Sequence, residues 1–196
     1  MHSLSKLQEQ IALDVRIGYK PRAVMIDDAR LQMPADYTPE WADEKATALV
    51  DALLQAHHDE QRLWASPTDC DLLDEAFAEL DRNGIIARQH FTCCQSCGHT
   101  EINTLIKQEQ AKRPVQGYVF FHQQDTQSAI DNGYFYMAYG SVSGKERASI
   151  KIAELALDTL QRAGLNATWN GWVRSRICIN DVVWQRRRIP SIFATR

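Results

Sequence analysis

Residues 85–99 constrain the fold of this chain more than any other stretch. The segment opens with an apolar run that predicts a buried strand over 85–91, and it then enters a turn that holds three of the five cysteines. A helix is expected over roughly 99–112, and the apolar segment 117–122 predicts a second strand that is buried on both faces. A strand, a helix and a strand in this order are typical of a parallel βαβ unit.

Helical patterns fill the chain before this unit. Thr38-Pro39 and Ser66-Pro67 each combine a capping hydroxyl with a proline at the first helical position, which predicts two helix starts. We therefore expect a helical N-terminal segment over 1–65, packed on a mixed α/β domain over 66–196.

Further strands are expected over 134–140 and on either side of Asn170-Gly171, a strong signal for a two-residue hairpin turn. The predicted fold class is α/β or α+β, with a mixed sheet of about five to six strands and packed helices. The connection over 124–133 barely reaches the ~10–12 residues of a parallel crossover. Strand 134–140 is therefore parallel to strand 118–123, antiparallel to it, or not its neighbour.

Charge is distributed unevenly along the chain. Residues 1–100 hold 9 Lys+Arg against 17 Asp+Glu, residues 101–196 hold 13 against 8, and the net charge is −3. This balance argues against a generic nucleic-acid binder, which has a pI above ~9.

No run approaches the ~18 apolar residues of a membrane span, and residues 1–10 lack the apolar core of a signal peptide. We expect a cytoplasmic protein whose cysteines are not structural disulfides.

Three interpretations compete for Cys93, Cys94 and Cys97. Two thiols spaced as C-x-x-C before a glycine are typical of a zinc knuckle, although a closed site needs four ligands. A thiol that follows a strand and opens a helix is also favoured as a thiolate, which suits redox or nucleophilic chemistry. Finally, free cysteines often pack as small apolar residues in a protein interior.

The ends of neighbouring strands decide which side chains join the cysteines. Ligands of open α/β sheets bind outside the carboxyl ends of parallel strands. If the first three strands are parallel neighbours, His122, Asp125 and Tyr139 reach one crevice with the thiols. The metal ligands we expect are Cys94, Cys97 and His122, with Cys93 and His99 as further candidates and zinc as the ion. For a catalytic role the candidates are Cys93, Cys94, His122, Asp125 and Tyr139.

Two motifs carry a resemblance to other proteins. F-T-C-C-x-x-C-G lies at 91–98 and H-Q-Q-D-T at 122–126. On these motifs the second half of the chain, roughly 66–188, resembles an uncharacterised bacterial family that is classed as a domain of unknown function. The resemblance implies a bacterial origin and no mechanism, because no activity is established for that family.

The leading hypothesis is a metal-binding protein whose Cys/His crevice holds zinc. One alternative is a non-catalytic binding protein of the immunity type, in which the acidic helices over 38–81 offer a surface to a basic protein partner. Another is a thiol-dependent enzyme. No membrane or nucleic-acid partner is expected.

Overall fold

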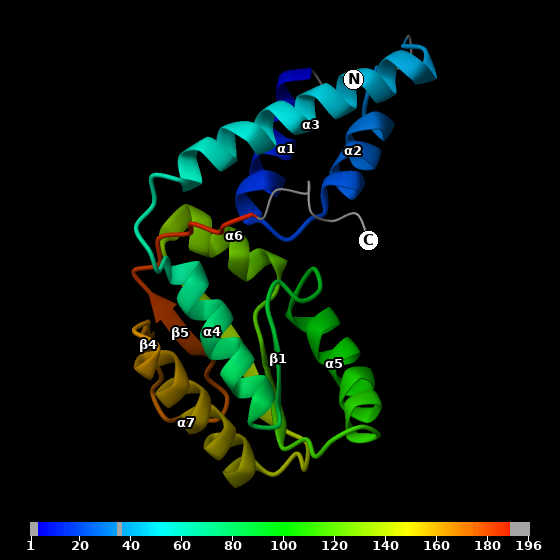
Figure 1. Ribbon diagram of the computed structural model, residues 1–196. Coiled ribbons are helices and arrows are strands. Elements are labelled where there is room, and N and C mark those ends of the chain that lie inside the picture. The colour runs from blue at the N-terminus through cyan, green and yellow to red at the C-terminus, as the bar shows by residue number, and fades with distance from the viewer. Residues whose placement is uncertain (1–3, 35–36, 189–196) are drawn as a thin grey trace. The chain divides into compact units, whose positions relative to one another are not determined.

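The computed structural model describes residues 4–34 and 37–188, and the chain divides into two compact units (Figure 1). Unit 1 comprises Met1–Ser66 with Gln185–Arg196, and unit 2 comprises Pro67–Trp184. The predicted division into a helical segment over 1–65, packed on a main domain over 66–196, stays a prediction.

The described part of unit 1 is helical, as the sequence predicts. Its helices are α1 (Leu4–Ile17), α2 (Arg22–Leu31) and α3 (Pro39–Gln61). Apolar side chains at helical spacing form their common core: Leu7, Ile11, Val15, Met25, Ile26, Ala29, Ala46 and Val50. The extended segment 185–188 is bonded to α3, because His57 Nε2 lies 3.0 Å from the Arg186 carbonyl and the Gln61 amide donates to the Arg188 carbonyl at 3.0 Å.

Unit 2 is a mixed sheet with packed helices, which confirms the predicted fold class. Its strands are β1 (Ile85–Arg88), β2 (Gly117–Phe120), β3 (Phe135–Ser141), β4 (Asn166–Thr168) and β5 (Ile177–Asn180). Its helices are α4 (Asp69–Arg82), α5 (Gln95–Gln110), α6 (Gln123–Asn132) and α7 (Glu146–Arg162). The strand order is β1-β2-β3-β5-β4, in which β1 and β2 are parallel and the other neighbouring pairs are antiparallel.

The antiparallel pairing of β2 and β3 corrects one expectation. Gly117 pairs with Ser141, so β3 ends at the edge of the sheet where β2 begins. The connection through α6 is too short for a comfortable crossover, and the chain turns back instead. Tyr139 pairs with Val119 inside the sheet, and the end of β3 lies opposite the start of β2, so the three strand ends do not form one crevice.

The two faces of the sheet are covered unequally. Helices α4 and α7 pack on one face and α5 on the other (Figure 1). Ile102 and Ile106 of α5 contact Ile86 and Phe120, the side chains that β1 and β2 direct to that face. Further along the same face, the paired residues Tyr136, Cys178 and Thr168 form a row across β3, β5 and β4.

The connection between β4 and β5 differs from the expected two-residue hairpin. The second strand begins at Ile177, later than predicted, and residues 169–176, here called the 169–176 loop, join the two strands. Asn170 does mark a turn, since its side-chain oxygen accepts from the Trp172 N–H at 3.0 Å. The turn lies inside a longer loop because Trp169 and Ser175 are also bonded to each other across it.

No helix among the described residues is long and apolar enough to cross a lipid bilayer.

Candidate metal centre

The turn before the cysteines has an unusual backbone. His90 and Thr92 have φ values of 50° and 57°, a region that non-glycine residues rarely adopt and that costs ~1–2 kcal/mol per residue. Hydrogen bonds from β2 hold the turn in place, because the Phe91 N–H donates to the Phe121 carbonyl at 2.8 Å and the Gln123 N–H to the Thr92 carbonyl at 3.0 Å. A strained backbone of this kind is often found at functional sites.

Helix α5 begins earlier than expected, at Gln95, so all three cysteines lie at its start. Cys94 is the N-cap residue, with an extended backbone and no hydrogen bond from its side chain to the helix. Gly98 lets the first turn approach β2, since a Cβ atom there would lie 2.4 Å from the Phe120 ring. The glycine of C-C-x-x-C-G thus lets the helical turn that carries Cys97 lie close to β2.

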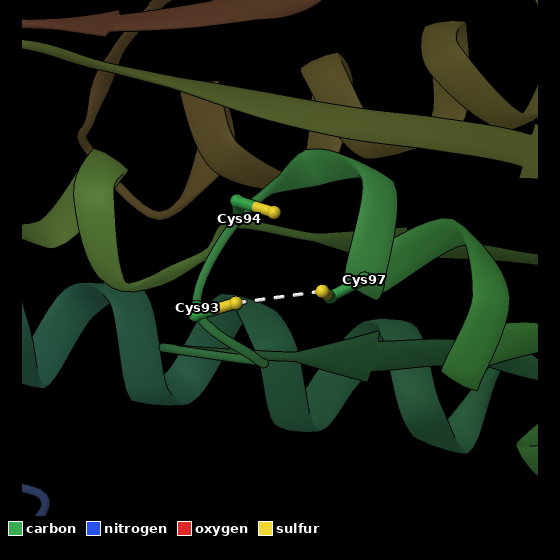
Figure 2. Close-up of side chains that lie close together, drawn as sticks. All are labelled: Cys93, Cys94 and Cys97. Atoms are coloured by element: carbon green, nitrogen blue, oxygen red, sulfur yellow. Dashed lines mark hydrogen bonds between the residues drawn. The ribbon is translucent and has the colours of Figure 1, made fainter.

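The three sulfur atoms form a compact group (Figure 2). They lie within 4.8 Å of one another, and the Cys93 thiol donates to the Cys97 sulfur at 3.4 Å. Over residues 4–34 and 37–188, no other set of three or more His, Cys, Asp or Glu side chains is arranged to hold a metal ion. Cys93 is exposed, while Cys94 and Cys97 are half-buried, so the group is open to solvent.

The thiols influence each other's protonation. The Cys97 backbone N–H, followed by the Cys97 and Cys93 side chains, lowers the pKa of the Cys94 thiol. Hydrogen bonds with Cys93 and Cys94, together with their charge, raise the pKa of Cys97 to about 11. Deprotonation is thus favoured at Cys94, while the charge of a neighbouring thiolate disfavours deprotonation of Cys97.

His122 has a different role from the one we expected. Its Nδ1 accepts from the Asp125 N–H at 3.2 Å and its Nε2 lies 3.1 Å from the Asp125 carboxylate, so one residue engages both ring nitrogens. The Asp125 carboxylate in turn accepts from the His122 N–H at 3.0 Å, which makes the pair a capping box for α6. Burial is the main cause that lowers the pKa of His122. The imidazole is not part of the thiol group.

The remaining candidates also have other contacts. His99 lies in α5 with its Nδ1 3.4 Å from the Tyr118 hydroxyl, and it is not part of the thiol group either. The Tyr139 hydroxyl donates to the Val173 carbonyl at 3.1 Å and so stabilises the 169–176 loop. Asp125 accepts from Arg176 Nη1 at 3.0 Å, a partner that sequence spacing did not suggest.

The acidic helices of the predicted partner surface are α3 and α4. They belong to different units, so the structure defines no common surface for them. A protein partner there stays a prediction.

Fold and site together define a mixed α/β protein with a cluster of three thiols at the start of a helix. The chain belongs to a family described as a domain of unknown function, DUF6891, whose model matches residues 1–188. That match is longer than the expected 66–188 and includes the three helices described in unit 1. No curated protein and no solved structure matches the chain.

Proposed function

We propose that Cys93, Cys94 and Cys97 bind one metal ion and that zinc is the ion they suit best. The observation that carries the proposal is the separation of the sulfurs, 3.4 Å for one pair and within 4.8 Å for all. Two thiolates that share a tetrahedral zinc at ~2.3 Å have sulfurs ~3.8 Å apart. Shifts of less than about 1 Å would bring the sulfurs to that spacing.

The choice of zinc follows from ligand type and coordination number. Thiolates are soft ligands that select zinc, copper(I) and iron–sulfur clusters over magnesium or calcium. Of these, zinc in a four-coordinate tetrahedral site is the usual partner of a C-x-x-C pair. Three sulfurs leave one position of the tetrahedron for water or an external ligand, and the exposure of Cys93 gives such a ligand access. The proposed site is thus open rather than closed by protein.

Neither histidine is needed as a ligand in this proposal. His122 has both nitrogens engaged by Asp125 in a buried capping box, and breaking that box would expose the start of α6. Replacing His122 in the expected set by Cys93 gives three ligands whose sulfurs already lie within 4.8 Å of one another.

Elemental analysis of protein purified without added metal tests the proposal. We expect about one zinc ion per chain, and its loss in Cys94→Ser and Cys97→Ser. Cys178→Ser is the matched control, because this half-buried thiol on β5 is outside the group and should leave the metal content unchanged. Wild-type protein without stoichiometric metal, which also fails to take up zinc or cobalt on titration, would contradict the proposal.

A thiol-dependent reaction is the second candidate, and the lowered pKa of Cys94 favours it. Alkylation of the metal-free protein by iodoacetamide near neutral pH distinguishes a thiol-dependent reaction from metal binding. A Cys94 that reacts faster than a free thiol, in a protein that does not bind metal, would support the thiol reaction. A Cys94 that zinc protects from alkylation would support the metal site.

A further inference from the structure

A cavity lies on the part of the sheet that α5 leaves uncovered. Its volume is about 530 Å³, within the ~300–1,000 Å³ typical of small-molecule sites. The row Tyr136, Cys178 and Thr168 lines it from the sheet, the 169–176 loop supplies further lining residues, and Gln95 adds the first turn of α5. Since Gln95 follows Cys94 directly, the cavity begins one residue from the thiol group.

Hydrogen bonds within the 169–176 loop preorganise the cavity. The Trp169 indole N–H donates to the Ser175 carbonyl at 3.2 Å, and the Asn170 amide donates to the Ser175 hydroxyl at 3.0 Å. The Ser175 N–H donates to the Trp172 carbonyl at 2.8 Å. A loop ordered in this way keeps its lining side chains in place before a ligand arrives, which lowers the entropic cost of binding.

The charged lining residues are all cationic. Arg174 and Arg176 line the cavity, and no carboxylate does. Buried Asp125 holds Arg176 through Nη1 at 3.0 Å, and the guanidinium lies 4.9 Å from the centre of the Tyr136 ring. Arg174 is exposed and, among the described residues, has no ion pair or hydrogen bond. Asp125 offsets the charge of Arg176 while fixing its position, so Arg174 supplies the excess positive charge.

The cavity also has aromatic walls. Tyr136, the second residue of β3, is 39% exposed, and the half-buried Trp169 ring lines the cavity with it. Guanidinium groups beside aromatic rings are suited to a ligand that carries an oxyanion and a flat apolar part.

We infer that this cavity binds a small organic oxyanion, a phosphate or carboxylate attached to a planar group. Arg174 and Arg176 donate hydrogen bonds to the oxyanion, and the planar group contacts Trp169 and Tyr136. The site is separate from the thiol group, and its ligand does not require the metal. Its position beside Gln95 places the bound molecule next to the start of α5.

Titrations followed by ¹H–¹⁵N spectra test this inference, with the Trp169 indole N–H as the reporter and Trp169→Phe to assign its signal. The probes are inorganic phosphate, phenyl phosphate, benzoate and neutral phenol. We expect saturable shifts with phenyl phosphate or benzoate, and these two show whether phosphate or carboxylate is preferred. Inorganic phosphate should bind more weakly, phenol should not saturate, and added salt should weaken anion binding.

Two matched variants test the contribution of Arg174 to anion binding. Arg174→Gln should weaken binding of the preferred anion about 10- to 100-fold, the effect of losing one charge-assisted hydrogen bond. Arg147→Gln removes the same charge from an exposed position on α7 outside the cavity and should leave binding unchanged. The inference is wrong if neither aromatic anion gives a saturable shift up to about 10 mM, ten times the Kd of a 1 mM site. It is equally wrong if phenol binds as well as the anions, or if both variants weaken binding alike.

Discussion

The Cys94→Ser substitution separates metal coordination from helix stability. Cys94 is the N-cap of α5 but gives the helix no side-chain hydrogen bond. Serine is nearly the same size and is among the preferred N-cap residues, whose capping bond is worth ~0.5–2 kcal/mol relative to alanine. Without metal, we therefore expect the variant to be as stable as the wild type or slightly more stable.

In the presence of zinc, we expect the wild type to be more stable than Cys94→Ser. At a free zinc concentration of ~1,000 times the Kd, binding stabilises the wild type by ~4.1 kcal/mol. For a chain of 150–250 residues, that raises Tm by roughly 8–16 °C. Loss of one of three thiolates increases the Kd, and a 100-fold increase removes ~2.7 kcal/mol of that ~4.1 kcal/mol at the same zinc concentration. The variant should then melt several degrees below the wild type.

Thermal unfolding followed by circular dichroism gives the Tm of the wild type and of Cys94→Ser, each in chelator and in buffered zinc. Cys178→Ser controls for the loss of a thiol outside the group. If the wild type melts at the same temperature in both buffers, or if Cys94→Ser gains as much from zinc as the wild type, the assignment of Cys94 as a ligand is refuted.

Three other substitutions test the surrounding structure. Gly98→Ala should lower the free energy of unfolding by ~1–3 kcal/mol, because its Cβ would lie 2.4 Å from the Phe120 ring, and Phe120→Leu in the same chain should recover part of that loss in urea titrations. Thr92→Asn and Thr92→Val both remove the hydroxyl that donates to the Cys94 carbonyl, so they differ mainly in how they tolerate the positive φ of this position. Thr92→Asn should therefore have a higher urea midpoint than Thr92→Val, because asparagine adopts a positive φ more readily than a β-branched residue; equal midpoints of the two variants would contradict the strain argument. Acidification from about pH 7.5 to pH 5.5 should lower the free energy of unfolding more in the wild type than in His57→Gln. Burial lowers the pKa of His57 below 6.5 in the folded state, so the unfolded state binds a proton first as the pH falls and is stabilised by it. An equal decrease in Tm on acidification in the wild type and in His57→Gln would contradict that reasoning.

The architecture of unit 2 could be predicted because its signals are local. Two-sided apolar runs mark β1, β2 and β3, and helix-stop glycines such as Gly84 and Gly133 separate them from their neighbours. The direction of β3 could not be settled, since a connection of that length is compatible with either pairing. The strands on either side of Asn170-Gly171 do pair antiparallel, but the two-residue connection was wrong because a turn signal does not define the length of the loop that contains it.

The candidate site was predictable in part. The C-C-x-x-C spacing identified the three thiols that the structure brings within 4.8 Å of one another. His122 was misleading, because a residue at a strand end can also cap the next helix, and only the geometry shows that Asp125 engages both of its nitrogens. Arg176 lies 51 positions from Asp125, and no local pattern relates them. The steric role of Gly98 likewise depends on Phe120, a residue of another element.

X-ray absorption at the zinc edge, on zinc-loaded wild-type protein, tests the central claim most directly because it reports the atoms bonded to the metal. Coordination by Cys93, Cys94 and Cys97 predicts three sulfur atoms at about 2.3 Å and one lighter atom at about 2.0–2.1 Å. A first shell with fewer than three sulfurs, or one made only of nitrogen and oxygen, would contradict it.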